Sequence, residues 1–349
     1  MPAFRQLQPN TPEAAALTSN IDLASAAIGT RIISATDEFF AEAENMLKVE
    51  PAVFIAEKFT ERGKWMDGWE TRRHNKTYDT AIIKLGFPGK IHGFDVDTSH
   101  FTGNHAPEVS IDAAVADEAT IQSGSAQWTT VLPRTSLNPD SHHLFALAQP
   151  TAQAYTHIRV NNYPDGGIAR LRVYGTVTPQ FQIQAQQSAK SKLIDLAFIG
   201  NGGKAVAGSN EHFTPVSNLI LPGRGVNMGD GWETKRSRTP NHNDWVIIKL
   251  GAPGYLKEVE IDTNHFIGNF PQSFTVHALS SSVENPGATN SQWEEILGHN
   301  PLTAHRQHYF KLNAPSNKAF THVKITIFPD GGLKRVRVLG ERAVDGAKL

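Results

Sequence analysis

The chain of 349 residues contains no cysteine, and this absence excludes thiol nucleophiles, cysteine-bound zinc, iron–sulfur clusters and disulfide frameworks. No sign of charge dominates, because 33 basic residues stand against 34 acidic residues and the two kinds are well mixed along the sequence. We therefore expect no basic surface for nucleic acid or for an acidic membrane, and we predict neither partner.

Long hydrophobic runs and familiar catalytic motifs are missing as well. No apolar stretch approaches the ~20 residues of a membrane span, and the opening sequence MPAFR lacks the apolar core of a signal peptide. The sequence predicts a soluble protein that is not secreted by the usual route. It has no Gly-x-Ser-x-Gly elbow, no His-Glu-x-x-His, no P-loop and no Gly-x-Gly-x-x-Gly after a strand. Any chemistry must therefore come from other polar clusters.

What the chain does contain is an internal duplication. Three segments recur in the same order about 165 residues further along: residues 67–73, 97–104 and 164–175 return as residues 230–236, 262–269 and 329–340. A period of this length is far longer than that of a solenoid repeat, so each copy should form a complete domain. We predict a first domain over residues 20–175, a Gln-rich linker over 176–192 and a second domain over 193–341.

Within each copy the dominant hydrophobic period is two residues. Residues 80–86 and 245–251 are β-branched runs that end in Gly, which is typical of strands in a sandwich core. Residues 157–160 and 170–173 alternate polar with apolar side chains, so we expect the apolar ones to face inward and the basic ones, such as Arg170, to face outward. Such strands, joined by turns rich in Gly and Pro, predict an all-β fold with one antiparallel jelly-roll β-sandwich in each copy.

The strongest polar cluster is the loop of residues 69–75. It combines the aromatic plate of Trp69 and the carboxylate of Glu70 with two guanidinium groups and the imidazole of His74. Arginine offers a planar fork that binds a carboxylate through two hydrogen bonds, and Glu or His can carry a proton. The alternative interpretation is a solvated loop in which Glu70 pairs with Arg72 or Arg73, since surface ion pairs are common and weak.

Two further clusters follow in each copy. Residues 97–107 contain His100 and Asn104, which either serve a site or are a satisfied sheet histidine and a turn asparagine. A metal site using Asp97, His100 and His105 can be drawn, but its spacing matches no known ligand pattern. Residues 163–167 form an Asp-Gly-Gly turn, in which Asp165 orients an arginine or supplies a second carboxylate to a pocket at the same end of the sandwich.

These clusters resemble the allantoicase family. The resemblance rests on Trp-x-Asp-Gly-Trp-Glu-Thr-Arg-Arg-His-Asn at residues 65–75, Gly-Asn-His-Ala-Pro at 103–107 and Tyr-Pro-Asp-Gly-Gly-Ile-Ala-Arg at 163–170, and it extends from about residue 20 to residue 341. It implies two tandem jelly-roll domains of galactose-binding-like fold, and an enzyme of purine and allantoin degradation that hydrolyses allantoate to ureidoglycolate and urea. The alternative is a non-catalytic sugar- or small-anion-binding β-sandwich protein, which the fold alone also permits.

The polar residues of the first copy can be given roles in this reaction. We expect Arg72 or Arg73 to bind the substrate carboxylate, because a guanidinium fork suits that group. We expect Glu70 and His100 to transfer protons, with the acid and the base unassigned. We expect Asn104 and Asp165 to hydrogen-bond the ureido groups. The predicted substrate-binding residues are Trp69, Arg72, Arg73, His74, Asn104 and Asp165.

The second copy keeps part of this set. Its equivalents are Trp232, Glu233, Arg236, His265, Asn269 and Asp330. It loses other polar residues: His74 and Asn75 align with Ser237 and Arg238, Arg72 with Lys235, and His105 with Phe270. Either both copies contribute to catalysis, or one copy is mainly structural.

The remaining expectations concern cofactors, partners and location. We expect allantoate as the small-molecule partner and no cofactor, with dependence on a divalent metal and formation of a homo-oligomer left open. The last three residues, Ala347, Lys348 and Leu349, are a conservative variant of the Ser-Lys-Leu peroxisomal address. They predict a peroxisomal protein, and the alternative is a cytoplasmic one.

Overall fold

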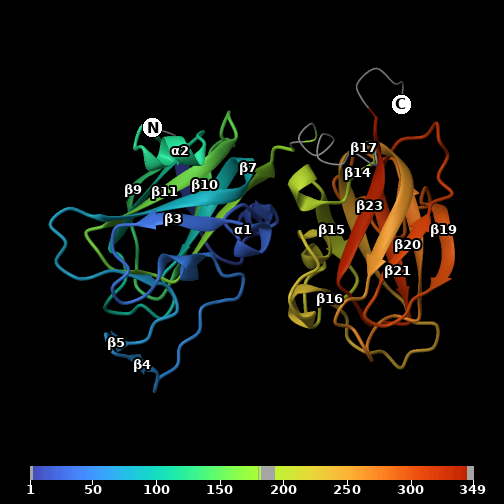
Figure 1. The fold of residues 1–349 in the computed structure, drawn as a ribbon, viewed down its shortest axis with the longest axis horizontal. Helices are drawn as coiled ribbons and strands as arrows, with labels where there is room; N and C mark the ends of the chain where they lie inside the picture. The colour runs from blue at the N-terminus through green and yellow to red at the C-terminus, as the bar shows by residue number, and fades with distance from the viewer. Residues whose placement is uncertain (1–2, 180, 182–192, 344–349) are drawn as a thin grey trace. The chain divides into compact units, whose positions relative to one another are not determined.

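A computed structural model describes residues 3–179, 181 and 193–343. The chain divides into two compact units, Met1–Thr178 and Pro179–Leu349, and strands are the main regular structure of both (Figure 1). Most of the predicted linker and the tail at Ala347–Leu349 lie outside the described residues. Among the helices of the described chain, none has the length and apolar character needed to cross a membrane.

The described part of the first unit contains seventeen helices and strands, of which thirteen are strands. They are β1 (Phe4–Leu7), α1 (Pro12–Thr18), β2 (Ile21–Asp22), η1 (Ala26–Ile28), β3 (Arg31–Ala35), η2 (Ala43–Leu47), β4 (Phe59–Thr60), β5 (Gly63–Lys64), β6 (Trp69–Glu70), β7 (Asp79–Asp97), β8 (Glu108–Ala114), α2 (Glu118–Gln122), β9 (Thr129–Ser136), β10 (His142–Leu147), β11 (Tyr155–Tyr163), β12 (Gly167–Ile168) and β13 (Arg170–Val177). In Figure 1 the small β4–β5 hairpin lies outside the sandwich, on a long connection.

Within its described residues, the second unit repeats this order without counterparts of β1, α1, α2 and the β4–β5 hairpin. Its elements are β14 (Ile194–Asp195), η3 (Ile199–Asn201), β15 (Lys204–Gly208), η4 (Val216–Ile220), η5 (Met228–Asp230), β16 (Trp232–Glu233), β17 (Asp244–Asp262), β18 (Ser273–Leu279), β19 (Glu294–Pro301), β20 (Gln307–Lys311), β21 (Phe320–Phe328), β22 (Gly332–Leu333) and β23 (Arg335–Arg342).

One long strand joins the two sheets of the first sandwich. The first part of β7 pairs with β3 and β11, and its last part pairs with β13 and β10. Asp79 is paired with Asn162 at the end of β11, whereas Asp97 is paired with Arg170 at the start of β13. β7 therefore leaves the loop between β11 and β13, turns near residues 86–89, and returns to the same loop in the other sheet.

The turn of β7 is closely packed. A Cβ atom on Gly86 would approach the carbonyl oxygen of Ile28 to 2.4 Å, so this position requires glycine. In the second unit β17 makes the same excursion, because its first part pairs with β15 and β21 and its last part with β23 and β20. The tandem β-sandwich predicted from the sequence is thus confirmed.

The sandwich core follows the predicted alternation. Ile158, Val160, Leu171 and Val173 all have 0% of their surface exposed, as expected for the inward positions of β11 and β13. Burial of each such side chain contributes about 1.5–3 kcal/mol relative to leaving it in water. The period of two in the sequence therefore identified the core face of both strands.

The N-terminal residues add to the first sandwich in a way that the duplication does not predict. β1 pairs with β10 along its whole length, and α1 packs Ala14 and Leu17 against Leu7 and Leu144. The side chain of Thr11 caps α1 by accepting a hydrogen bond from the Ala14 amide at 3.2 Å. At the other end of the unit, β13 continues through Thr176 and Val177, the first two residues of the predicted linker.

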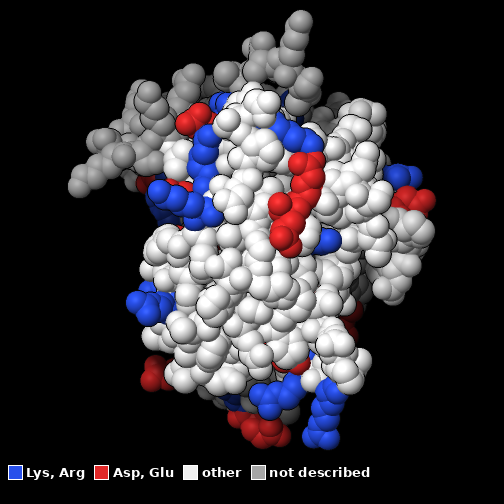
Figure 2. All heavy atoms as spheres, turned by 90° about the vertical axis from the view of Figure 1, so that its right-hand side faces the viewer, with Lys and Arg blue, Asp and Glu red and all other residues white. Residues whose placement is uncertain are grey.

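Charged side chains are mixed on the surface as they are in the sequence. On the face of the protein drawn in Figure 2, Lys and Arg side chains stand close to Asp and Glu side chains around a wide area without charge. This face presents no patch of one sign that would attract a polyanion.

Candidate active site

Three loops of the first unit meet at the end of the sandwich where β7 begins and ends. β6 precedes β7 in the chain and pairs with β12, so that Gly167 lies opposite Glu70. The loop after β7 joins them, because His105 forms a bridge with Gly167 and the Gly167 amide donates to the carbonyl of Asn104 at 2.7 Å. Residues far apart in the sequence are thereby held together by backbone hydrogen bonds.

The turn between β11 and β12 depends on a glycine. Gly166 has a φ of +135°, and a Cβ atom there would come within 2.5 Å of the carbonyl oxygen of His105. Its amide donates to the hydroxyl of Thr71 at 3.1 Å, which ties the turn to the loop after β6. The Asp-Gly-Gly sequence thus supplies both the backbone conformation and the close approach that the site needs.

Glu70 is the central group of this cluster. Its side chain is 7% exposed, and its Oε1 accepts hydrogen bonds from Asn104 Nδ2 at 2.9 Å and from Arg73 Nη2 at 2.8 Å. The second oxygen, Oε2, has no hydrogen bond with any residue in the described part of the chain. Burial raises the pKa of the Glu70 carboxyl, although the hydrogen bond from Asn104 and the charge of Arg73 oppose this change.

Arg73 is fully engaged within the protein. Besides Glu70, its Nη2 donates to the carbonyl of Asn104 at 3.1 Å, and its Nη1 donates to the carbonyl of Thr71 at 2.9 Å. The same Nη1 lies 3.7 Å from Asp165 Oδ1. Both terminal nitrogens are therefore occupied, so the geometry makes Arg73 a support for Glu70. The fork that we expected to bind a substrate carboxylate is already filled.

Asp165 and Asn104 lie where the sequence predicted, beside Glu70 and Arg73. The carboxylate of Asp165 also accepts a hydrogen bond from the Asn75 amide at 3.0 Å, which fixes it against the loop after β6. Asn104 contributes its side-chain amide to Glu70 and its carbonyl to Arg73. These residues form what we call the Glu70 cluster: Glu70, Arg73, Asn104 and Asp165.

Arg72 and His74 lie on the exposed side of the same loop. The Arg72 side chain is 66% exposed, its Nε lies 3.4 Å from Asp37 Oδ2, and its guanidinium group stacks over the ring of Phe39 at 4.7 Å. Its terminal nitrogens have no hydrogen-bond partner within the described residues. His74 is exposed and has a φ of +67°. Arg72 is therefore the guanidinium group of this loop that is free to bind a carboxylate.

The two tryptophans predicted to contact substrate are buried. Trp69 and Trp232 each have 0% of their surface exposed, and each indole donates to a backbone carbonyl, of Asp37 and Asn210 respectively, at 2.8 Å. Such a side chain packs under the loop and has no face open to a ligand. The expectation of an aromatic plate beside the substrate is wrong for this reason.

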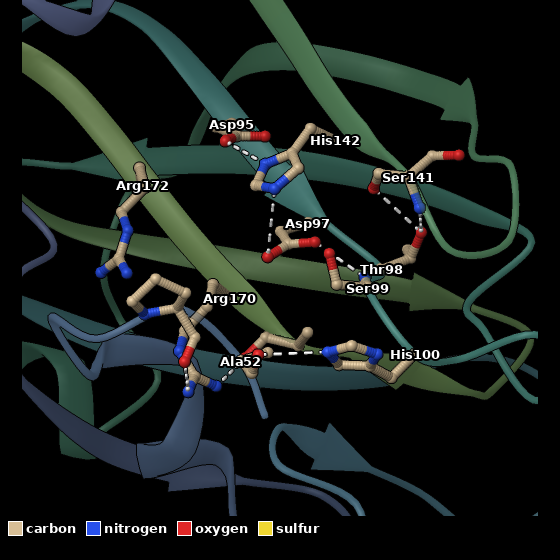
Figure 3. Close-up of polar contacts among 12 residues, drawn as sticks. Ala52, Asp95, Asp97, Thr98, Ser99, His100, Ser141, His142, Arg170 and Arg172 are labelled. Carbon is tan, nitrogen blue, oxygen red and sulfur yellow. Dashed lines mark hydrogen bonds and ion pairs between the residues drawn. The ribbon is translucent and has the colours of Figure 1, made fainter. Parts of the chain in front are cut away.

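His100 lies apart from the Glu70 cluster. Its Nε2 is 3.1 Å from the carbonyl oxygen of Ala52, and its ring stacks on Phe54 at 5.9 Å. Figure 3 shows the ring pointing toward Ala52, in the region of Arg170. The contacts of His100 are thus with the loop before β6, and they place no reacting group beside it. The structure does not bring His100 together with Glu70.

Arg170 corrects a second expectation. The prediction that it faces outward is wrong, because the residue is 2% exposed. Its Nη2 lies 2.6 Å from Asp67 Oδ2, and its Nε and Nη1 donate to the carbonyls of Glu50 and Asp67 at 2.8 Å. The segment that contains Glu50 and Asp67 folds over this face of β13 and supplies most of the acceptors of this buried guanidinium group, and the carbonyl of Ala169 supplies another.

His105 is a titratable residue near the Glu70 cluster that the prediction from the sequence did not assign to proton transfer. It follows Asn104, and its buried Nδ1 has no hydrogen-bond partner among the described residues. Burial lowers the pKa of His105, as do the nearby charges of His143 and Arg73, although a hydrogen bond with the Leu137 backbone opposes this change. Burial thus favours the neutral form of the ring. In the sequence it stood out as a member of the drawn metal triad and by the difference between the copies, since Phe270 replaces it in the second.

The second unit keeps the carboxyl–amide pair of the cluster. Asn269 Nδ2 donates to Glu233 Oε1 at 2.7 Å, and the carboxylate of Asp330 accepts from the Ser237 amide at 2.7 Å. Arg236, in contrast, is exposed and makes no ion pair within the residues that the structure describes. His265 lies apart from this pair, against His305 with ring centroids 5.6 Å apart.

A metal site at the predicted position is not formed. Across residues 3–179, 181 and 193–343, no group of three or more His, Asp or Glu side chains is arranged to hold a metal ion. Asp97 instead accepts a hydrogen bond from the Ser99 amide at 2.7 Å, while His100 turns to Ala52. The proposed triad of Asp97, His100 and His105 is therefore not brought together.

The fold and the cluster together define a duplicated β-sandwich protein with a polar site of carboxyl, guanidinium and amide groups at one end of its first sandwich. The family model of the allantoicase repeat matches residues 21–178 and 194–343, which lie one in each unit. The chain belongs to the allantoicase family.

Individual relatives agree over nearly the whole length. The probable allantoicase 2 of Burkholderia pseudomallei strain K96243 is 46% identical over 341 residues, which cover 97% of this chain and 98% of that protein. The probable allantoicase of Schizosaccharomyces pombe is 44% identical over 342 residues, with 97% and 98% covered. The crystal structure of allantoicase from Saccharomyces cerevisiae aligns with a TM-score of 0.83 at 37% identity, covering 97% of this chain and all of that one. The resemblance inferred from the motifs is confirmed.

Proposed function

We propose that this chain hydrolyses allantoate to ureidoglycolate and urea, and that the Glu70 cluster of the first unit is its active site. Membership of the allantoicase family supports the reaction. One observation carries the assignment of the site: the largely buried carboxyl group of Glu70 is hydrogen-bonded through only one oxygen, at the point where three loops meet. A carboxyl group in such a position can exchange a proton with a bound substrate.

The reaction requires three kinds of contact. Allantoate has one carbon that carries a carboxylate and two ureido groups, and the net reaction replaces one ureido group by a hydroxyl group. The departing urea nitrogen must receive a proton, and a base must either activate water or remove a proton from the remaining ureido group. The carboxylate needs a cation, and the ureido N–H groups need acceptors.

Glu70 supplies the proton transfer in this proposal. Burial raises the pKa of its carboxyl, so the protonated form, which can donate a proton, is more populated at a given pH than it is for an exposed glutamate. Arg73 and Asn104 hold Oε1 and thereby direct Oε2 toward the substrate. His105, whose neutral form is favoured by burial, is the second group able to exchange a proton in this neighbourhood.

Substrate orientation falls to the residues around Glu70. Asp165 accepts a ureido N–H, since a carboxylate offers only acceptors and this one is already fixed by Asn75. Arg72 binds the substrate carboxylate, because its terminal nitrogens are free whereas those of Arg73 are occupied. Arg73 acts as a positioning residue that keeps Glu70 in place.

The test is release of urea from allantoate by the purified chain, measured with and without a chelator. Urea release at a rate that depends on protein concentration supports the proposal, and loss of activity with the chelator would establish a metal requirement. No urea, combined with measurable binding of a simple sugar, would overturn the proposal in favour of a non-catalytic β-sandwich binding protein.

A further inference from the structure

The second unit has a cavity at the position equivalent to the Glu70 cluster. Its volume is about 680 Å³, and Glu233, Arg236, Asn269 and Asp330 line it. A cavity of this size falls within the range of small-ligand sites, about 300–1,000 Å³. The same three loops that meet in the first unit meet here, since β16 pairs with β22 and the Gly332 amide donates to the carbonyl of Asn269 at 2.8 Å.

The acceptors of this cavity are built as in the first unit. Glu233 is held by the amide of Asn269, and Asp330 is held by the backbone of Ser237. Each of these carboxylates has hydrogen-bonding capacity left, because each is bound by a single donor within the described chain. Two fixed carboxylates on the wall of a cavity select a ligand that offers N–H groups.

The cation of this cavity differs from that of the first unit. Arg73 is occupied by Glu70, Thr71 and Asn104, whereas its equivalent Arg236 lies exposed, without an ion pair in the part of the second unit that is described. A free guanidinium fork binds a carboxylate through two parallel hydrogen bonds. The cavity therefore combines a free anion-binding group with two N–H acceptors.

The cavity also lacks two features that the proposed active site has. Phe270 stands where the first unit has the imidazole of His105, and Phe270 lines the cavity. Glu233 is half-buried, whereas Glu70 is buried, and Glu233 makes no ion pair within the described residues. The second copy has thus kept groups that bind, but it has lost the imidazole of His105 and the ion pair that holds Glu70.

We infer that the cavity of the second unit binds a small ureido carboxylate as a separate, non-hydrolysing site, with the carboxylate on Arg236 and the ureido N–H groups on Glu233 and Asp330. This inference rests on the proposed function, because the ligand is of the same chemical class as the substrate. The duplication has then produced one site for reaction and one for binding only.

The test is titration calorimetry with allantoate on the Glu70→Gln variant, in which turnover is suppressed. We expect two equivalents of allantoate per chain. Adding Arg236→Gln should weaken one of them by on the order of tenfold to a hundredfold, the effect of losing a hydrogen-bonded charge, and leave the other. The matched control is Arg238→Gln, which removes an exposed arginine two positions away and should leave both equivalents in place.

Each outcome separates this inference from the proposed function. A single equivalent in Glu70→Gln, or two unchanged equivalents after Arg236→Gln, would overturn the second site even if the wild-type chain releases urea. Two equivalents of which one depends on Arg236, together with no urea release by the wild type, would uphold the second site as a binding site and overturn the proposed reaction. Melting temperatures of all variants establish that each is folded.

Discussion

Replacement of Glu70 by Gln tests the active site with a small change in structure. Gln keeps the size of the side chain, and its Oε1 can still accept from Asn104 and Arg73. It removes the group that titrates. Any loss of turnover is then assigned to proton transfer, because the packing of a side chain that is only 7% exposed stays the same.

The expected loss of turnover is roughly 10²-fold or more, the usual contribution of a positioned acid or base. At about 1.36 kcal/mol for each factor of ten, this corresponds to about 2.7 kcal/mol of transition-state stabilisation. The free Oε2 of Glu70, which has no partner among the described residues, is the atom through which this proton transfer would take place.

The stability of the Glu70→Gln variant, unlike its turnover, should rise or stay the same. Burial raises the pKa of Glu70 in the folded protein, so its contribution to stability is complete below the pKa of the unfolded chain and is lost as pH rises through the folded value. At neutral pH the ionised carboxylate therefore lowers the free energy of unfolding. Gln carries no charge, and we expect its melting temperature to equal or exceed that of the wild type.

Glu233→Gln is the matched control, because it changes the equivalent residue of the second unit. Turnover of both variants is followed by urea release, and unfolding by circular dichroism. We expect a much smaller loss of turnover for Glu233→Gln at similar stability. Equal large losses at unchanged stability would refute the assignment of catalysis to the first unit alone. Equal losses with lower melting temperatures would show that both carboxylates only brace their loops.

Three further predictions concern other charges. Arg73→Lys should lower kcat/KM by an amount that corresponds to about 1–3 kcal/mol of transition-state stabilisation while preserving the fold, because Lys cannot make the four contacts of the guanidinium group. Wild-type kinetics would show that Arg73 does not belong to the site. Arg170→Met should lower the free energy of unfolding in urea by up to about 3–5 kcal/mol, since it removes the buried partner of Asp67, which keeps only its contacts with Lys48 and the Val53 amide, and leaves the backbone carbonyls around Arg170 without their donor. Its control is Arg31→Met, which breaks an exposed pair and should cost less than about 1 kcal/mol. Asp95 raises the pKa of His142 to about 9, so the stability from this pair is complete below pH 6.5 and lost as pH rises through about 9; His142→Gln should reduce that pH dependence in melting curves, modestly because the ring is half-exposed.

The sequence was sufficient for the core faces of the strands and for part of the polar cluster. Period-two patterns predicted the buried residues of β11 and β13, and the duplication showed which loops to compare. Glu70, Arg73, Asn104 and Asp165 were predicted as site residues, and the structure places them in contact with one another. These predictions rest on local patterns, which a sequence records directly.

What the sequence could not provide is which atoms are already occupied. Arg72 and Arg73 are chemically identical in the sequence, and only the fold shows that one is saturated by acceptors and the other is free. Trp69 and Arg170 were assigned to the surface because the loops that cover them come from other parts of the chain. Whether a distant loop buries a side chain depends on tertiary packing, and the alternation of polar and apolar residues along one strand carries no information about it.

The path of β7 also determines where the first unit can be lengthened. Because the strand leaves the Glu70 cluster and returns to it, the separation of the loops at the site is set by strand length and pairing register, while the connections at the opposite end are independent of it. The connection between β8 and β9, which contains α2, lies at that opposite end, since Ala114 is paired with His157. Doubling a flexible loop costs only about 0.6 kcal/mol of closure entropy. A fluorescent reporter or a pair of new chain termini introduced there should leave the contacts between Glu70 and Asn104 intact.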